Sequence, residues 1–282
     1  MCMTIGFDIG GTNIRVGLID SKNNLVFCHQ EATPQKDVYK KIVGLVKIVP
    51  NYKDVKSIGL GVPGMVINDE VVTCRNVPEL MNSKIASRLS KEFKIPVHIE
   101  NDGKIAALGE AICGAGRGSK IMCYVGLGTG VGGGVVIDGK VYTGSNGLGG
   151  YFTRVKINGK MSEFLVSGTY MLKMARERLG AGFALQSFSD VIALLKDKNP
   201  VIIKLMEEFK DNLTELLLNI SATINPDTIV LGGGLMRSKD YFLPDVITRF
   251  KRECHEQAKN TKIIAAELDQ AGVIGAGLFA KK

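Results

Sequence analysis

The 282-residue chain has few of the side chains that hold structural metals or form disulfide bonds. It contains three histidines and six cysteines, which are Cys2, Cys28, Cys74, Cys113, Cys123 and Cys254. The cysteines are scattered and form no C-x-x-C pair, whereas a structural zinc site needs four such ligands at close spacing. The composition therefore argues against structural zinc and indicates a reducing compartment.

Long apolar runs and targeting signals are also missing. No window approaches 18 consecutive apolar residues, and the residues from Met3 predict a strand rather than a signal peptide. The net charge is +8, but the lysines are spread along the chain without a nucleic-acid motif. Diffuse positive charge suits an anionic substrate such as a nucleotide, and solvated lysine-rich faces explain it equally well. We expect a cytoplasmic protein that binds neither nucleic acid nor membranes.

Hydrophobic periodicity predicts secondary structure along the whole chain, with no low-complexity linker. At 45% apolar residues, the chain is long enough for a large core and two lobes. The pattern predicts strands at 3–8, 14–19, 25–29, 57–62, 96–99, 122–126, 135–138, 141–143, 228–231 and 262–266, and a short strand pair at 67–72. It predicts helices at 36–49, 82–93, 103–112, 163–180, 188–196, 200–224, 239–257 and from about 270.

The segment Ile99-Glu100-Asn101-Asp102 joins a predicted strand to a predicted helix. Asn and Asp at such a junction can cap the helix by accepting its free N–H groups. Alternatively, Asp102 is a carboxylate base at the carboxyl end of a strand, where open α/β sheets bind ligands. The helix dipole would favour its ionised form, which suits a proton acceptor. Glycine-rich loops elsewhere in the chain favour the second interpretation.

The first glycine-rich loop joins two predicted strands near the N-terminus. Gly10-Gly11-Thr12 follows a strand that ends on Asp8. Glycines at the tip of a hairpin let backbone N–H groups and the Thr12 hydroxyl approach a phosphate closely. An ordinary hairpin turn would need only one glycine. Asp8 adds a candidate ligand for Mg²⁺ or its waters.

The second glycine-rich loop spans residues 126–134. Its glycines satisfy G-x-G-x-x-G, but a predicted strand follows instead of the helix that a dinucleotide-binding motif requires. Residues 134–140 also spell G-x-x-x-x-G-K, but Val141 replaces the Ser or Thr of a P-loop. The remaining interpretation is a second glycine-lined hairpin, the counterpart of the first. Two such hairpins can face each other across a nucleotide.

The order of these segments resembles the actin-like ATPase fold of sugar kinases and, within it, the ROK (repressor, open reading frame, kinase) family. The matching segments are Asp8–Thr12, Gly61–Gly64, Glu100–Asp102 with Ala106–Glu110, Gly128–Gly134, Asn146–Gly149 and Val230–Gly234. The resemblance implies an α/β protein of the ribonuclease H-like type, with two lobes and a nucleotide cleft between them. One lobe would comprise residues 1–113 and the C-terminal helix 267–282, and the other residues 114–266. It also implies a homodimer.

The resemblance assigns roles to individual residues. Asp102 would accept the proton of the sugar hydroxyl, and Asn101, Gly64, Asn76 and Glu163 would bind the sugar. ATP with Mg²⁺ would be the phosphoryl donor, because phosphoryl transfer needs positioning and charge neutralisation. The expected nucleotide-binding residues are Asp8, Gly10, Gly11, Thr12, Gly128, Thr129 and Gly130 at the phosphates and Gly232, Gly233 and Gly234 at the adenosine.

The chain departs from the family pattern between the second lobe's glycines and Glu163. The family usually places a sugar-binding Glu and a zinc-binding His where this chain has Tyr151 and Arg154. The cysteine-rich zinc loop that normally follows is replaced by the cysteine-free residues 155–162. Loop and histidine are lost together, as the loss of the metal predicts, so we expect a zinc-less variant.

These departures bear on the substrate. Tyr and Arg are mainly hydrogen-bond donors, which suits an acceptor such as an amide carbonyl, and the family's N-acetylmannosamine kinases share the loss of Glu. Alternatively, Arg154 pairs with a surface carboxylate. We expect phosphorylation of the 6-hydroxyl of a hexose or N-acylhexosamine, with N-acetylmannosamine first and glucose or fructose as the alternative. A non-catalytic sugar sensor is a further hypothesis, which the intact base and phosphate glycines disfavour.

Overall fold

The computed structural model describes residues 3–180 and 182–281. Close contacts divide the chain into two units. Unit 1 comprises Met1–Gly118, Gly134–Gly150 and Glu267–Lys282, and unit 2 comprises Ser119–Gly133 and Tyr151–Ala266. This division differs from the two expected lobes in residues 134–150, which belong to unit 1, and in the first boundary, which falls after residue 118 instead of 113.

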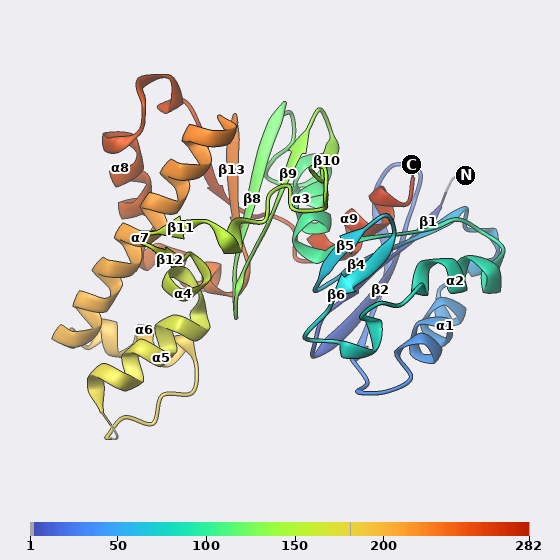
Figure 1. Ribbon diagram of the computed structural model, residues 1–282, viewed down its shortest axis with the longest axis horizontal. Coiled ribbons are helices and arrows are strands. Elements are labelled where there is room, and N and C mark those ends of the chain that lie inside the picture. The colour runs from blue at the N-terminus through green and yellow to red at the C-terminus, as the bar shows by residue number, and fades with distance from the viewer. Residues whose placement is uncertain (1–2, 181, 282) are drawn as a thin grey trace. The chain divides into compact units, whose positions relative to one another are not determined.

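Unit 1 is built on a five-stranded sheet with the order β3-β2-β1-β4-β7. Strands β1, β2 and β3 form an antiparallel meander, whereas β4 and β7 run parallel to β1. Figure 1 shows α1 and α2 on one face of this sheet and α3 and α9 on the other. The bounds are β1 Thr4–Ile9, β2 Asn13–Ile19, β3 Leu25–Ala32, β4 Ser57–Val62, β7 Val97–Asn101, α1 Val38–Ile48, α2 Ile85–Phe93, α3 Asp102–Cys113 and α9 Ala271–Phe279, with a hairpin of β5 Met65–Ile67 and β6 Glu70–Thr73.

A row of glycines explains why α9 can lie directly on this sheet. Gly6 is paired in register with Gly17 on one neighbouring strand and with Gly59 on the other. A Cβ atom at Gly6 would lie 2.1 Å from the carbonyl oxygen of Val273, and one at Gly59 would lie 1.9 Å from that of Ala276. The missing side chains thus admit the helix backbone. The opposite face of β1 carries Ile5, Phe7 and Ile9 into the core beneath α1 and α2, in the strand's two-residue period.

Unit 2 combines parallel strands with helices. Strands β8, β13 and β14 are parallel, in a sheet with the order β10-β9-β8-β13-β14, and the chain passes from unit 2 to unit 1 within β9. The long helix α7 carries a buried apolar stripe and packs against α4, α5, α6 and α8. The bounds are β8 Ile121–Leu127, β9 Val131–Ile137, β11 Lys156–Ile157, β12 Lys160–Met161, β13 Thr228–Gly232, β14 Lys262–Ala265, α4 Glu163–Val166, α5 Gly168–Leu179, α6 Phe188–Lys196, α7 Pro200–Ile224 and α8 Leu243–Glu253, and β10, whose residues belong to unit 1, is Lys140–Tyr142.

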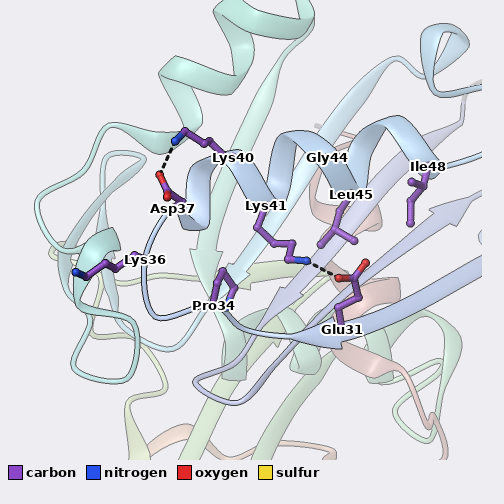
Figure 2. A pocket seen from close by; sticks show the side chains of 9 residues that line it. All are labelled: Glu31, Pro34, Lys36, Asp37, Lys40, Lys41, Gly44, Leu45 and Ile48. Atoms are coloured by element: carbon purple, nitrogen blue, oxygen red, sulfur yellow. Dashed lines mark hydrogen bonds and ion pairs between the residues drawn. The ribbon is translucent and has the colours of Figure 1, made fainter.

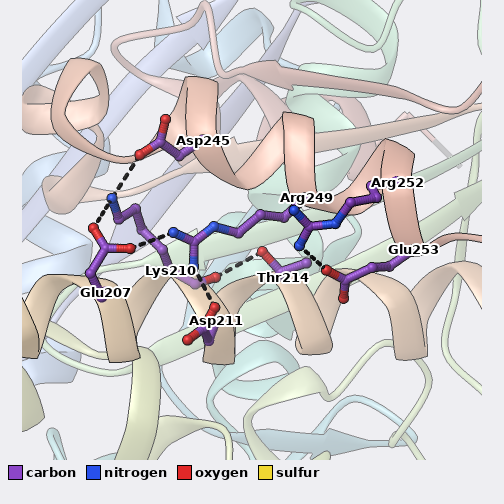
Figure 3. Close-up of polar contacts among 8 residues, drawn as sticks. All are labelled: Glu207, Lys210, Asp211, Thr214, Asp245, Arg249, Arg252 and Glu253. Carbon is purple, nitrogen blue, oxygen red and sulfur yellow. Dashed lines mark hydrogen bonds and ion pairs between the residues drawn. The ribbon is translucent and has the colours of Figure 1, made fainter.

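An ion-pair network joins α7 to α8 in unit 2 (Figure 3). The Nζ atom of Lys210 lies 2.7 Å from Asp245 Oδ2 and also contacts Glu207. Arg249 contacts Glu207 and Asp211, so two cations share three carboxylates. The side chain of Lys210 is only 8% exposed, which makes it a well-compensated buried lysine.

Two of the predicted helices were wrong in extent. The helix expected at 163–180 is divided into α4 and α5 by Ser167, whose backbone is extended and whose hydroxyl accepts a hydrogen bond from the amide of Tyr170. Serine often leaves the helical conformation to cap the next helix. The helix expected at 239–257 spans only Leu243–Glu253 and follows a 3₁₀ segment at Gly234–Tyr241.

Candidate active site

The end of β7 and the start of α3 hold Asn101 and Asp102 side by side. Asn101 is the N-cap of α3, because its Oδ1 accepts a hydrogen bond from the Lys104 amide at 3.3 Å. Its Nδ2 donates to the Gly64 carbonyl at 2.9 Å and to Asp102 Oδ1 at 3.0 Å. Asn101 therefore caps the helix, and the Asp102 carboxyl group lies at the helix's first turn.

The pKa of Asp102 is raised to about 7. Burial is the largest cause, and the negative charge of Asp8 adds to it, while hydrogen bonds from Gly103 and Asn101 oppose both. The residue as a whole keeps partial access to solvent. A carboxyl group that titrates near neutrality and can be reached from outside has the properties of a general base.

Asp8, at the end of β1, is the second carboxylate of this region. Burial raises its pKa, and the guanidinium of Arg15, 3.2 Å away, opposes the rise. Arg15 also donates through Nε to Gln30 at 2.7 Å, which orients the guanidinium. Arg15 was not among the residues predicted from the sequence. The antiparallel register of β1 and β2 pairs it directly with Asp8 and could have revealed it.

The first glycine turn closes as expected. The Gly10 amide donates to the Asn13 carbonyl at 2.8 Å, and Thr33 Oγ1 donates to the Gly10 carbonyl at 2.7 Å. Thr12 is exposed at the tip. Asn76, expected at the sugar, lies beside this turn, since a Cβ atom at Gly11 would be 3.0 Å from Asn76 Cβ.

In unit 2 the structure brings together the two expected nucleotide segments. A Cβ atom at Gly128 would have the Gly234 amide nitrogen, 4.0 Å away, as its nearest neighbour. Glu163 lies beside the same loop, because a Cβ atom at Gly130 would be 2.6 Å from its Oε1. Thr129, Gly233 and Gly234 are exposed, whereas the ring of Tyr124 packs against Gly232.

Tyr151 precedes a 3₁₀ turn at Phe152–Arg154 in unit 2, and Arg154 is its last residue. Tyr151 is half-buried, whereas Arg154 is exposed and places Nη1 3.3 Å from Met161 Sδ. The cysteine-free segment after them is the short β11–β12 hairpin. Within residues 3–180 and 182–281, no three His, Cys, Asp or Glu side chains cluster as metal ligands would. None of the helices in these residues combines the length and apolarity of a membrane span.

A surface pocket of about 490 Å³ lies elsewhere in unit 1, between β3 and α1. None of the candidate residues above lines it. Figure 2 shows two ion pairs at its lining, Lys40 with Asp37 and Lys41 with Glu31, and Lys36 as a third cation. We assign it no part in the site.

The whole chain is similar in sequence and in fold to known sugar kinases. The chain is 31% identical over 255 residues to the N-acetylgalactosamine kinase AgaK of Shewanella sp. (strain ANA-3), covering 83% of this chain and 82% of the relative. It is 28% identical to the N-acetyl-D-glucosamine kinase of Photobacterium profundum, with 98% of each chain covered. The crystal structure of a ROK family glucokinase from Streptomyces griseus, in complex with glucose and AMPPNP, matches with a TM-score of 0.82 at 25% identity, covering 99% of each chain.

Fold and relatives together define the class as sugar kinases with an actin-like ATPase fold. The family model described as the ROK family matches residues 4–282, and the chain belongs to that family. The resemblance deduced from the sequence motifs is thereby confirmed, as is the fold class. The roles of the individual site residues stay predictions.

Proposed function

We propose that the protein transfers the γ-phosphoryl group of ATP to the 6-hydroxyl of an N-acylhexosamine, with N-acetylmannosamine as the preferred acceptor. The observation that carries the kinase assignment is Asp102, a carboxyl group with a pKa of about 7 at the end of β7. A base with this pKa is half ionised at neutral pH, and it can accept a proton without holding it too tightly.

Asp102 accepts the proton of the sugar hydroxyl as the oxygen attacks the γ-phosphorus. Asn101 keeps its side chain fixed through Gly64 and Asp102, and its amide orients a neighbouring hydroxyl of the sugar. Positioning of this kind supplies most of the catalysis in phosphoryl transfer.

The nucleotide needs Mg²⁺, which neutralises the charge that spreads over the transferred phosphoryl group. The residues fit this ion, because Mg²⁺ usually binds one or two carboxylates and completes its shell with phosphate oxygens and water. Asp8 is the carboxylate we assign to it or to its waters, beside Gly10, Gly11 and Thr12. Gly128–Gly130 and Gly232–Gly234 would bind the phosphates and the adenosine. No zinc takes part.

The choice of acceptor class rests on Tyr151 and Arg154. Both side chains are donors and match the carbonyl of an N-acyl group better than a pair of hydroxyls. The exposed Arg154 guanidinium contacts Met161, a weak acceptor, through Nη1, and its other N–H groups can donate to the sugar. Two relatives are named as kinases of N-acetylgalactosamine and N-acetylglucosamine, and others are named as glucokinases, so the relatives include both acceptor classes and the choice between them rests on Tyr151 and Arg154.

Steady-state kinetics with a panel of sugars tests the proposal. We expect ADP release to depend on added sugar and kcat/KM to be at least tenfold higher for N-acetylmannosamine than for glucose or fructose. N-acetylglucosamine and N-acetylgalactosamine complete the panel. A tenfold preference for glucose or fructose would refute the N-acyl assignment, and absence of sugar-dependent ADP release would favour a non-catalytic sensor.

Two substitutions test whether Tyr151 and Arg154 determine the preference between N-acetylmannosamine and glucose. Tyr151→Phe and Arg154→Gln should each reduce the ratio of kcat/KM between N-acetylmannosamine and glucose several-fold, because each removes a donor. Tyr52→Phe and Arg252→Gln are matched controls. The Tyr52 ring packs on Phe93 in unit 1, and Arg252 pairs with Glu253 on α8. An unchanged ratio in both test variants would remove these residues from acceptor recognition.

A further inference from the structure

Lys104 is a buried lysine close to the proposed base. Its side chain is 1% exposed, and it extends from the first turn of α3, two residues after Asp102. Lysine in the first turn of a helix is normally solvated, and burying an ammonium group costs several kcal/mol unless hydrogen bonds compensate it. The contacts of the Nζ atom therefore indicate why this side chain is buried.

The nearest partner of the ammonium group is a loop, not a carboxylate. Nζ donates to the main-chain carbonyl of Gly147 at 2.8 Å, whereas its distance to Glu100 Oε1 is 3.4 Å. The same Glu100 oxygen accepts a hydrogen bond from the Asn101 amide at 2.8 Å. Loop 144–150 and the strand end that carries Asn101 are thus joined through one ammonium group and one carboxylate.

The other side of the loop is held as well. Gly147 has a φ of +74°, and a Cβ atom there would lie 2.5 Å from the Val66 carbonyl oxygen, so the loop backbone packs tightly on β5. Immediately before β5, the Gly64 carbonyl accepts the side-chain amide of Asn101. The contacts therefore form a ring: Lys104 contacts the loop, the loop packs on β5, Gly64 before β5 contacts Asn101, and Asn101 and Lys104 both contact Glu100.

We propose that Lys104 is a positioning residue that fixes loop 144–150 against Asn101 and Asp102, so that the loop forms part of the sugar site. This inference rests on the proposed function. Between the two fixed glycines Gly144 and Gly150, the side chains of Ser145, Asn146 and Leu148 remain exposed. Ser145 and Asn146 offer the sugar two polar groups, and Leu148 offers it an apolar surface.

A purely stabilising ion pair would behave differently. Buried pairs can often be replaced by apolar side chains without loss of function. A positioning residue instead affects the ligand that the positioned loop meets, and displacement by about 1 Å can cost up to about 100-fold in rate. If Lys104 is a positioning residue, its replacement must therefore change KM for the sugar and leave KM for ATP nearly unchanged.

The test uses Lys104→Met and the double variant Lys104→Met/Glu100→Gln, which leaves no unpaired buried charge. We expect KM for the sugar to rise tenfold or more in both variants, while KM for ATP stays within twofold. Lys210→Met is the matched control (Figure 3), because it also removes a buried, paired lysine. It should leave KM for the sugar unchanged.

Hydrogen–deuterium exchange of peptides covering residues 142–150 provides a readout that needs no activity. Exchange should be faster in both Lys104 variants than in the wild type and unchanged in Lys210→Met. Unchanged exchange, or an unchanged KM for the sugar in the double variant, would overturn the inference. If the wild type phosphorylates no sugar, the proposed function fails. Sugar binding and its loss in the Lys104 variants, measured by calorimetry, then decide the inference by the same tenfold criterion.

Discussion

The two ends of α3 each bury a carboxyl group, and they treat it in opposite ways. At the C-terminal end, Glu110 is fully buried and accepts hydrogen bonds from the amides of Ala115, Glu267 and Leu268 at 2.9 to 3.2 Å. At the N-terminal end, Asp102 accepts two hydrogen bonds but experiences the charge of Asp8. Glu110 thus accepts three hydrogen bonds from backbone amides. Asp102 accepts fewer, lies near another negative charge, and has a pKa of about 7.

The difference separates a carboxyl group held by three backbone amides from the carboxyl group that we propose as the base. Glu110 holds the chain where it leaves α3 and where it returns before α9, so its donors belong to fixed backbone. Asp102 has fewer hydrogen bonds, which fits the role proposed for it, since a carboxylate with all its acceptors satisfied would be a poor base. Uncompensated charge at a functional position is a cost to folding that proteins tolerate where chemistry needs it.

The largest effect should come from Asp102→Asn. The amide cannot accept the proton of the sugar hydroxyl, so kcat should fall by roughly 10²–10⁴-fold. The hydrogen bond from Asn101 can be kept, because the Asn oxygen replaces the carboxylate oxygen. Steady-state assays with saturating ATP and sugar measure the loss. Near-normal turnover would remove Asp102 from the role of base.

The same variant should not be less stable than the wild type at pH 8. The folded-state pKa of Asp102 is raised above its ordinary value of 3.8, so the wild type loses stability as the pH rises from about 4 through 7. Asp102→Asn carries no such penalty. Urea unfolding at pH 8 and pH 4 should show a stability gain that disappears at the lower pH. A loss of stability at pH 8 would mean that the carboxylate is better compensated than its contacts indicate.

The regular parts of the fold could be predicted from periodicity. The spans of β4, α6 and α7 coincide with the predicted ranges, because each is a run with one clear period between polar or proline boundaries. Ser167, which divides the predicted helix 163–180, was missed because apolar spacing does not record a cap. The Ser-Gly pair at 167–168 was the available signal.

Candidate site residues could be predicted only where they belong to a motif of neighbouring residues in the sequence. Asp102 could be proposed as a base because a strand end followed by a helix is visible in the sequence. Arg15 required the register of a hairpin, and Lys104 required a contact with Gly147, 43 residues away. Pairings of the second kind depend on how distant segments pack, and a single sequence does not contain them.

The pH dependence of activity tests whether the pKa of Asp102 is raised and whether Asp8 contributes to the rise. The profile of kcat/KM reports the base in the free enzyme, so activity should fall about tenfold per pH unit below about pH 7. In Asp8→Asn, the residual activity should have its acid limb at lower pH, because the charge of Asp8 raises the pKa of Asp102. A limb that stays in place would show that burial alone sets this pKa.

The smallest effect should come from Glu110→Gln, and it should fall on stability. Three backbone amides donate hydrogen bonds to the two carboxylate oxygens of Glu110. Gln has only one acceptor oxygen, so its NH₂ group must face at least one of these amides. Stability should therefore fall by about 1–3 kcal/mol. Urea unfolding at pH 7 measures the loss, and kcat should stay within about twofold because no reacting group is touched. The control is Glu267→Gln, whose side chain is exposed and lies 3.9 Å from Arg117. It should change stability by less than about 0.5 kcal/mol. If Glu110→Gln instead reduced kcat as strongly as Asp102→Asn, the two ends of α3 would not divide structure from chemistry.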